Sequence, residues 1–375
     1  MVHTPTGARP VIPYGRQTIT DDDIATVVDV MRGSWLTQGP AVARFEDALC
    51  HVTEARHAVA FSNGTAALHG ALWAAGIGAG DTVVTSPLSF VASANCARYV
   101  GATPAFVDID ASTLNLDPSL VGVCDALVAV HYAGLPVDLA ALPVRPQVVV
   151  EDAAHALGAR TPDGPVGNCA RSDLTTFSFH PVKAITTGEG GAVTTNSDEL
   201  AERLRRFRSH GTVPRPDADG EGGWYYEVET LGFNYRLTDL QAALGVSQLG
   251  KLGRFVIRRN ELAQRYHALL GNVAGVQLPP LASAAGWRHA YHLFPVRVEE
   301  RRRVYDEMRA AGIGVQVHYV PIYRHPLYAD TGMTGAQFPE TERAYAGLLS
   351  LPMHPSLTDD DQDRVVDTLR AVMRR

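Results

Sequence analysis

The sequence predicts an α/β fold whose main element is a mostly parallel, seven-stranded sheet. Seven short β-type runs precede residue 200, and most are continuously apolar, as in strands that are buried on both faces. Helix-like stretches separate several of these runs, and this alternation is typical of a parallel sheet with helices on both faces. The predicted strands are HAVAFS (57–62), DTVVTSP (81–87), TPAFVDID (103–110), ALVAVHY (126–132), QVVVEDAA (147–154), LTTFSFH (174–180) and GAVTTN (191–196).

The helices are predicted from the remaining apolar patterns. TAALHGALWAAG (65–76) and ANCARYVG (94–101) follow predicted strands and are expected to cover the sheet. Another helical pattern spans 198–209, and a polar loop rich in Gly, Pro and Asp follows at 212–223. A long helix is expected over 238–270, and three glycines inside it are points where it can bend.

The last third of the chain predicts a smaller, mixed region. YHLFPVRV (291–298) and GVQVHYV (314–320) have the composition of strands. The segment 358–375 predicts a helix, because a threonine and three aspartates open it and arginines close it, which matches the helix dipole. The expected division is an N-terminal arm (1–20), whose first ten residues should be mobile, a large domain (21–250) and a small C-terminal α/β domain (251–375).

Composition excludes several functional classes. The formal net charge of −7 argues against non-specific nucleic-acid binding, which needs a basic face. No apolar run approaches the roughly 18–20 residues of a membrane span, and the first residues lack the apolar core of a signal peptide. The four cysteines are scattered without a C-x-x-C pair, which argues against a zinc ribbon and a disulfide framework. We therefore expect a cytoplasmic protein with no metal site and no membrane or nucleic-acid partner.

The most informative segment is FSFHPVKAITTGEGGAV (177–193), in which Lys183 lies between a short apolar strand and a Gly-rich turn. A lysine becomes a nucleophile when burial or a nearby cation favours its neutral amine, which can then form a Schiff base with an aldehyde. Asp152 lies upstream, and an aspartate that ends a buried strand is a typical partner for the ring nitrogen of pyridoxal phosphate (PLP). The pair predicts a PLP enzyme. The alternative, a solvated surface lysine, does not suit the apolar and glycine-rich flanks.

Two segments predict an anion site for the cofactor phosphate. SNGTAALHGAL (62–72) has the pattern of a strand end, a tight turn and a helix start near Thr65, where free amides and a hydroxyl bind anions. Ser178 precedes Lys183 by five residues and offers a second hydroxyl. By itself, the first segment also fits an ordinary capped helix. Neither the dinucleotide-binding glycine pattern nor the Walker loop is present, so NAD and ATP are not indicated.

Three residues are candidates for contacts with the cofactor ring. A carboxylate of Asp152 against the pyridinium nitrogen would keep the ring protonated, although a helix-capping aspartate explains this residue equally well in isolation. His155 would lie on the same side, near the ring oxygen, if a helical turn begins there, and its alternative is a structural histidine. Phe90 offers a flat face for stacking, and its alternative is a core aromatic. The order and joint presence of these pieces favour the PLP interpretation.

At these residues the chain resembles the DegT/DnrJ/EryC1 family of PLP-dependent sugar aminotransferases, over about residues 12–373. The motifs that carry the resemblance are LTQGP (36–40), SNGTAAL (62–68), EDAAHALGA (151–159), FSFHPVKAITTGEGGAV (177–193), FRSHG (207–211), GFNYRLTDLQAALGVSQL (232–249), QVHYVPIY (316–323) and SLPMHPSL (350–357).

The resemblance implies the aspartate aminotransferase-like fold of PLP-dependent transferases, fold type I, and transaminase activity. It implies that Lys183 carries PLP as a Schiff base and is the catalytic residue. Asn234, in the GFNYR segment, would reach the phosphate site of a neighbouring subunit, so a homodimer with shared active sites is implied. The other implied cofactor contacts are Gly64, Thr65, Phe90, Asp152, His155 and Ser178.

Within the family, the chain is similar to the C4-aminotransferases that act on UDP-4-keto-6-deoxy-N-acetylhexosamines, such as the enzyme that forms UDP-4-amino-4,6-dideoxy-N-acetyl-β-L-altrosamine for pseudaminic acid. The cues are IPYGRQTIT (12–20), SFVASAN (89–95), HYAGLPVD (131–138) and QVHYVPIY (316–323). The implied reaction moves an amino group from L-glutamate to the keto carbon of the nucleotide sugar. The residues expected to line the sugar pocket are Tyr14, Gln38, His318, Tyr319 and Tyr323.

Three other interpretations use the same residues. A nucleotide-sugar 3-dehydratase would have histidine in place of Lys183, so the lysine counts against it. An aminotransferase for TDP-ketosugars or a keto-inositol would share the whole cofactor site. A PLP-binding regulator without turnover is the third, and the absence of a DNA-binding appendage and the intact pair of Lys183 and Asp152 both count against it.

Overall fold

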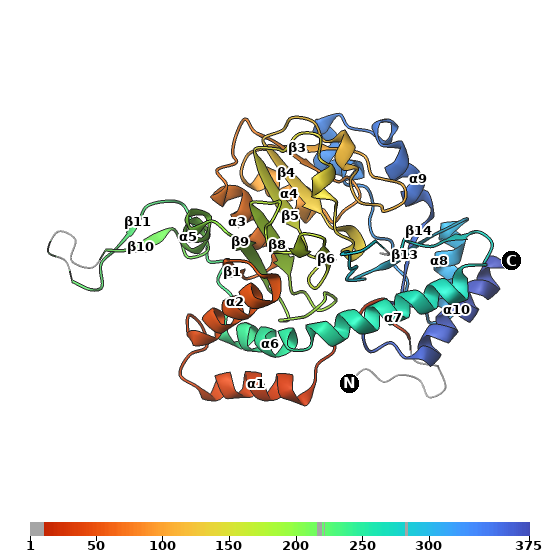
Figure 1. The fold of residues 1–375 in the computed structure, drawn as a ribbon, viewed down its shortest axis with the longest axis horizontal. Helices are drawn as coiled ribbons and strands as arrows, with labels where there is room; N and C mark the ends of the chain where they lie inside the picture. Colours follow the sequence, from red (N-terminus) through yellow and green to blue (C-terminus); the bar gives the residue numbers. More distant parts are fainter. Residues whose placement is uncertain (1–10, 216–219, 221, 282–283) are drawn as a thin grey trace.

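A computed structural model describes residues 11–215, 220, 222–281 and 284–375 (Figure 1). The predicted mobility of the first ten residues falls outside the described residues, and so does part of the predicted loop at 212–223. The flanks of that loop form a short antiparallel hairpin of β10 (Thr212–Pro214) and β11 (Tyr226–Val228) that projects away from the body of the molecule (Figure 1). The division into an arm and two domains stays a prediction.

A seven-stranded sheet forms the centre of the structure, and all seven predicted strands belong to it. The order across the sheet is β1-β9-β8-β5-β4-β2-β3, and only β9 runs antiparallel to its neighbours. The prediction of a mostly parallel sheet is therefore confirmed. The strands are β1 (His57–Phe61), β2 (Thr82–Thr85), β3 (Thr103–Phe106), β4 (Ala126–Val130), β5 (Val148–Asp152), β8 (Leu174–Ser178) and β9 (Gly191–Thr195).

Helices cover both faces of this sheet, which explains why its strands are apolar on both sides. In β1, Val59 and Phe61 join one core cluster while Ala58 and Ala60 join another. The first cluster packs under α3 (Gly64–Ala74), α4 (Ala92–Tyr99) and α5 (Asp198–Phe207). The second packs under α2 (Pro40–Thr53) and α6 (Asp239–Leu249), and α1 (Asp21–Arg32) lies against α6.

The predicted long helix over 238–270 is two helices. Thr238 and Gln241 form a capping box at the start of α6, and α6 ends at Leu249. After a break at Gly250 and Lys251, α7 (Leu252–Leu270) continues toward the C-terminal part of the molecule (Figure 1). Glycine has a low helix propensity, so a break at Gly250 agrees with the expected weak point.

A three-stranded antiparallel sheet forms the second, smaller core with α7. Its strands are β12 (Val276–Gln277), β13 (Phe294–Val298) and β14 (Leu348–Leu351), with α8 (Arg301–Ala310), α9 (Pro339–Gly347) and α10 (Asp359–Met373) nearby. The predicted strand at 314–320 is wrong. In that segment Gln316 pairs with Ser350 in an isolated bridge, and the chain then turns toward the large sheet, where Tyr132 Oη donates to the His318 carbonyl at 2.6 Å.

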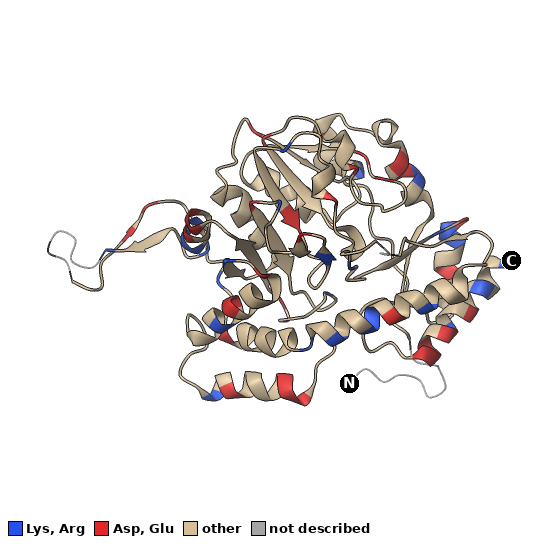
Figure 2. Ribbon diagram, in the orientation of Figure 1, with Lys and Arg blue, Asp and Glu red and all other residues tan. Residues whose placement is uncertain are grey.

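Charged residues of both signs occur on the outer helices (Figure 2). The predicted C-terminal helix is confirmed as α10, with Asp359, Asp360 and Asp361 in its first turn and Arg370 in its last. Among the described residues, none of the helices combines the length and apolar character that crossing a membrane requires.

Two short pairings occur outside the large sheets, and the first is antiparallel. The β6 (Arg160–Thr161) and β7 (Gly164–Pro165) strands form a two-residue hairpin after β5. At the start of the described chain, Ile12 forms a parallel bridge with Ile313, and Tyr14, two residues later, lies beside the QVHYVPIY segment. The N-terminal segment is therefore fixed next to a cavity at the edge of the large sheet.

Candidate active site

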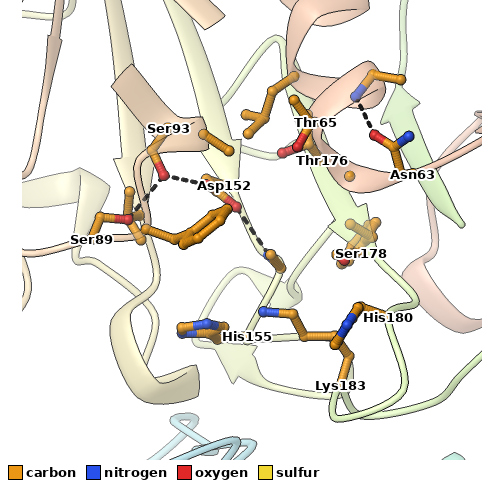
Figure 3. A pocket seen from close by; sticks show the side chains of 18 of the residues that line it. Asn63, Thr65, Ser89, Ser93, Asp152, His155, Thr176, Ser178, His180 and Lys183 are labelled. Carbon is orange, nitrogen blue, oxygen red and sulfur yellow. Dashed lines mark hydrogen bonds between the residues drawn. The ribbon is translucent and has the colours of Figure 1, made fainter. Parts of the chain in front are cut away.

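A cavity of about 1000 Å³ opens where β5 and β8 end and α3 begins (Figure 3). Carboxyl ends of parallel strands are the usual place for binding sites in such sheets. Ten of the predicted site residues line this cavity, although they come from six separated segments of the chain. They are Tyr14, Gly64, Thr65, Phe90, Asp152, His155, Ser178, Lys183, His318 and Tyr319.

Strand alternation decides which side chains of β5 and β8 face the cavity. Val150 belongs to the core under α3 and α4, so Asp152, two residues on, points to the same side. In β8, Leu174 belongs to that core, and Ser178 lies four residues further on the same face. Glu151 faces the opposite side, where it contacts His131 at 2.7 Å. Asp152 rather than Glu151 is therefore the carboxylate of the cavity.

Lys183 lies in the loop after β8 and extends its ε-amine toward His155 (Figure 3). A turn in which the Lys183 amide donates to the His180 carbonyl at 2.9 Å sets its position. Burial lowers the pKa of Lys183 from 10.5 to about 8, and the charge of Asp152 opposes this change. A substantial fraction of the amine is therefore neutral near physiological pH, as a nucleophile requires.

Asp152 is buried, and hydrogen bonds reach both of its oxygens. Ser93 Oγ donates to Oδ2 at 2.6 Å, and the Ala154 amide donates to Oδ1 at 3.2 Å (Figure 3). Donors of this kind stabilise the ionised form of a carboxylate. The cavity therefore contains a fixed anion at the end of β5.

Three histidines gather on the side of the cavity that includes Tyr319. His155 Nε2 lies 3.1 Å from Tyr319 Oη, and its ring centroid is 4.3 Å from that of His292. Burial lowers the pKa of His155 and of His292 well below the ordinary value, and it lowers the pKa of His318 to about 4. The nearby Lys183 charge adds to each effect. All three rings are therefore neutral at physiological pH.

The start of α3 forms a cradle for an anion. Asn63 caps the helix by accepting from the Ala66 amide at 2.8 Å, and the amides of Gly64 and Thr65 precede the first intrahelical bond. A Cβ at position 64 would lie 2.8 Å from Ser178 Cβ, so only glycine fits there. The Thr65 and Ser178 hydroxyls line the same cavity.

Three predicted site residues do not line this cavity within the described part of the chain. Tyr323 is buried elsewhere, where its hydroxyl donates to Glu342 at 2.6 Å and its ring stacks on Phe338. Gln38 and Asn234 are exposed, and Asn234 bridges Ser209. The QVHYVPIY motif led us to expect Tyr323 in the sugar pocket. In the structure its ring belongs to a buried cluster and its hydroxyl donates to Glu342.

The cavity also contains residues that the sequence analysis did not select. Ser89, Ser93 and His292 line it with the predicted residues. The spacing of Ser89 and Ser93 by four residues at a helix start was a usable signal, because such residues meet on one side of a helical turn. His292 lies 109 residues after Lys183 with no local motif between them, so only tertiary structure could place it.

The donor set fits PLP. The cavity has a lysine with a lowered pKa for the aldehyde, a carboxylate for the ring nitrogen and a helix start for the phosphate. His155 Nδ1 is buried and has no hydrogen-bond partner among the described residues, which leaves a polar atom available beside the ring position. Among the described residues, no group of three or more His, Cys, Asp or Glu side chains is arranged to hold a metal ion.

Comparison with known proteins agrees with this geometry. The family model for DegT/DnrJ/EryC1/StrS aminotransferases matches residues 17–370. Spore coat polysaccharide biosynthesis protein SpsC from Bacillus subtilis is 38% identical over 382 residues, which cover 97% of each chain.

Two solved structures are similar over nearly their whole length. Spr1654 from Streptococcus pneumoniae, in its PLP-form, has a TM-score of 0.88 at 27% identity over 97% of this chain and 99% of that chain. Helicobacter pylori PseC, an aminotransferase involved in the biosynthesis of pseudoaminic acid, has a TM-score of 0.88 at 30% identity, with the same coverage of both chains. The chain therefore belongs to the DegT/DnrJ/EryC1/StrS aminotransferase family, and it is a PLP-dependent sugar aminotransferase of fold type I.

Proposed function

We propose that this enzyme transfers the amino group of L-glutamate to the keto carbon of a nucleotide-linked keto-deoxysugar. The specific substrate that we propose is a UDP-4-keto-6-deoxy-N-acetylhexosamine, aminated at C4. The observation that carries the proposal is the pairing of Lys183, whose pKa is lowered to about 8, with the fixed anion of Asp152 in one cavity.

Lys183 has two roles in this proposal. When bound, PLP supplies an electron sink that makes protons on the adjacent carbon acidic. The Lys183 amine would hold the cofactor through its aldehyde. Once an amino substrate has taken that place, the Lys183 amine would be the group that accepts and returns a proton, because its lowered pKa leaves the amine free to accept one. Asp152 keeps the ring nitrogen protonated, and the start of α3 with Ser178 binds the phosphate.

The neutral polar groups beside Lys183 are suited to a sugar. Tyr14 and His318 line the cavity with ring centroids 5.2 Å apart, and Tyr319 follows directly in the chain. Such groups can both donate and accept hydrogen bonds with hydroxyl or acetamido groups. They carry no positive charge, so they would orient the uncharged sugar rather than its diphosphate.

We propose a homodimer in which exposed Asn234 reaches the phosphate site of the neighbouring subunit. Gln38 is also exposed, and its place in the sugar pocket stays a prediction. The four cysteines are free thiols in the structure, which suits the reducing cytoplasm that we propose as the location.

The relatives support the choice of substrate class. PseC is an aminotransferase of pseudoaminic acid biosynthesis, and SpsC takes part in the synthesis of a spore coat polysaccharide. The names of both relatives refer to complex sugars. The cavity of about 1000 Å³ is large enough for a sugar beside the cofactor.

Mass spectrometry of the products tests the proposal. The holoenzyme and L-glutamate are incubated with UDP-4-keto-6-deoxy-AltNAc, with its GlcNAc epimer or with a TDP-4-keto sugar. We expect an aminated product and an equal amount of 2-oxoglutarate from a UDP-linked substrate. Amination of the TDP sugar alone would contradict the nucleotide assignment. A PLP band that does not bleach with any amino donor would contradict the aminotransferase activity itself.

A further inference from the structure

A short segment before and within α4 holds the carboxylate of Asp152. Ser93 Oγ donates to Asp152 Oδ2 at 2.6 Å, and the hydroxyl oxygens of Ser89 and Ser93 lie 2.9 Å apart (Figure 3). Because the single hydroxyl proton of Ser93 goes to the carboxylate, Ser89 donates the proton between the two serines. The result is a hydrogen-bonded chain from Ser89 through Ser93 to Asp152, and such chains strengthen each of their bonds.

The backbone explains how the two serines meet. The Ser93 amide donates to the Phe90 carbonyl at 3.2 Å, and the Asn95 amide donates to the Val91 carbonyl at 2.9 Å. This is the geometry of a helical turn, in which residues four apart lie on one side. Phe90, between the serines, is 56% exposed and lines the cavity, while both serines are buried. One turn therefore presents an aromatic ring to the cofactor position and two hydroxyls to the carboxylate.

The two donors on Asp152 leave its carboxylate with little freedom to rotate. The Ala154 amide occupies Oδ1 while Ser93 occupies Oδ2, so the remaining lone pairs have a fixed direction. The titratable groups that sense the charge of Asp152 are Lys183, Cys96 and Tyr319, and only Lys183 of these carries a positive charge.

We propose that Ser93, supported by Ser89, is a positioning residue that keeps the carboxylate of Asp152 directed at the ring nitrogen of PLP. The inference rests on the proposed function, because it needs the cofactor on Lys183. Without the Ser93 hydroxyl, the carboxylate of Asp152 can rotate away from the ring nitrogen, so the ring is protonated to a smaller extent. The ring then carries less positive charge, so the nitrogen that joins the cofactor to Lys183 holds its own proton more tightly.

A spectroscopic titration tests this role. Ser93→Ala is loaded with PLP, and the visible band of the cofactor is recorded from about pH 5 to about pH 10. We expect the midpoint of its titration to rise by about one pH unit relative to wild type. Ser93→Thr keeps the hydroxyl and should restore the wild-type midpoint.

Ser86→Ala is the matched control. Ser86 is a buried serine of the same loop, and its hydroxyl accepts from the Leu88 amide at 3.2 Å rather than bonding to Asp152. This variant should lose thermal stability to a similar degree without moving the midpoint. A residue that only stabilises the loop would give the same result at both positions, so equal midpoints for Ser86→Ala and Ser93→Ala would overturn the proposal.

Two further results are informative. If Ser93→Ala does not fold, Ser93→Cys provides the test. A thiol is a weaker hydrogen-bond donor than a hydroxyl, so the pH midpoint of the cofactor band in this variant should lie above that of wild type. A wild-type midpoint in Ser93→Cys would refute the proposal.

Borohydride trapping of the wild type separates a failure of the role of Ser93 from a failure of the proposed function. Label on Lys183, together with unchanged midpoints in the Ser93 variants, refutes only the role of Ser93. Failure to label Lys183 refutes the proposed function and this inference with it.

Discussion

His155 and Tyr319 are 164 residues apart in the chain, yet His155 Nε2 lies 3.1 Å from Tyr319 Oη in the cavity. Burial raises the pKa of Tyr319 and lowers that of His155, so both groups are neutral and the bond joins two uncharged partners. The bond connects the loop after β5 with the segment between β13 and β14. It therefore joins two parts of the cavity lining that are distant in the sequence.

Loss of this bond should slow transamination. Tyr319→Phe removes the hydroxyl and leaves His155 Nε2 without that partner, which costs on the order of 1–2 kcal/mol, or about tenfold in rate if the bond is maintained in the transition state. The measurement is kcat for 2-oxoglutarate release, with Tyr305→Phe on α8 as the matched control. Equal rates for both variants would show that His155 does not need Tyr319.

The reactivity of Lys183 should follow its lowered pKa. In the cofactor-free protein, the rate of PLP uptake by Lys183 should rise with pH and reach half of its plateau near the pKa of about 8 rather than at 10.5. Asp152→Asn removes a charge that raises the pKa of Lys183, so its midpoint should move to lower pH. Stopped-flow absorbance of PLP binding gives both curves. A higher midpoint in Asp152→Asn would contradict the assigned electrostatics.

The same burial should make Lys183 a cost to the stability of the cofactor-free protein. A lysine whose pKa is lower in the folded than in the unfolded state destabilises fully below about pH 8, and this cost disappears as the pH rises toward 10.5. Lys183→Met should therefore raise the free energy of unfolding at pH 7 by on the order of 1–2 kcal/mol, after discounting for the partial exposure of the side chain. Urea unfolding at several pH values measures it, and the gain should shrink above about pH 8.

Substitution of Lys183 should also abolish catalysis. Lys183→Ala and Lys183→Arg should fold and bind the nucleotide sugar, but turnover should fall by about a thousandfold or more, because the acid–base group is absent or fully protonated. Release of 2-oxoglutarate is the measurement. Full activity in either variant would refute the assignment of Lys183.

The cradle at the start of α3 should not tolerate a methyl group. Gly64→Ala would place its Cβ 2.8 Å from Ser178 Cβ, so the helix start must shift away from the phosphate position, and we expect about tenfold weaker PLP binding or more. Gly253→Ala is the control, because a Cβ there meets no atom within 4 Å. In Gly64→Ala/Ser178→Gly the contact is removed, so the double variant should bind no worse than Ser178→Gly alone. Additive losses would contradict the steric explanation.

A mixed dimer tests the sharing of active sites. Lys183→Ala and Asn234→Ala chains, each inactive or weak alone, should complement each other when they are expressed together. Random pairing makes half of the dimers mixed, and each mixed dimer has one intact site, so about a quarter of the wild-type sites should be recovered. Activity no higher than the mean of the two single variants would show that Asn234 acts within its own chain or not at all.

The strands of the large sheet could be predicted from the sequence because each one depends on a local pattern of residues. HAVAF, VVVED and GAVTT are short apolar runs between turn residues, and such runs form strands wherever both faces are covered. The antiparallel direction of β9 was not readable, because it depends on how the chain returns across the sheet. The predicted strand at 314–320 was wrong for the same reason. Its apolar pattern is local, but a strand also needs a partner along its length, and in this segment the bridge to the neighbouring chain is that of Gln316 with Ser350.

Local patterns in the sequence predicted that Lys183 and Asp152 lie together. Asp152 ends β5 and Lys183 lies in the loop directly after β8, and carboxyl ends of parallel strands meet at one edge of a sheet, so both residues were expected at the same edge. Only the tertiary structure decided which other groups join them. It brought Ser93 to Asp152 and Tyr319 to His155, and it buried Tyr323 against Glu342. Local patterns fix where strands and helices begin and end, whereas contacts between distant residues depend on how those elements pack against one another.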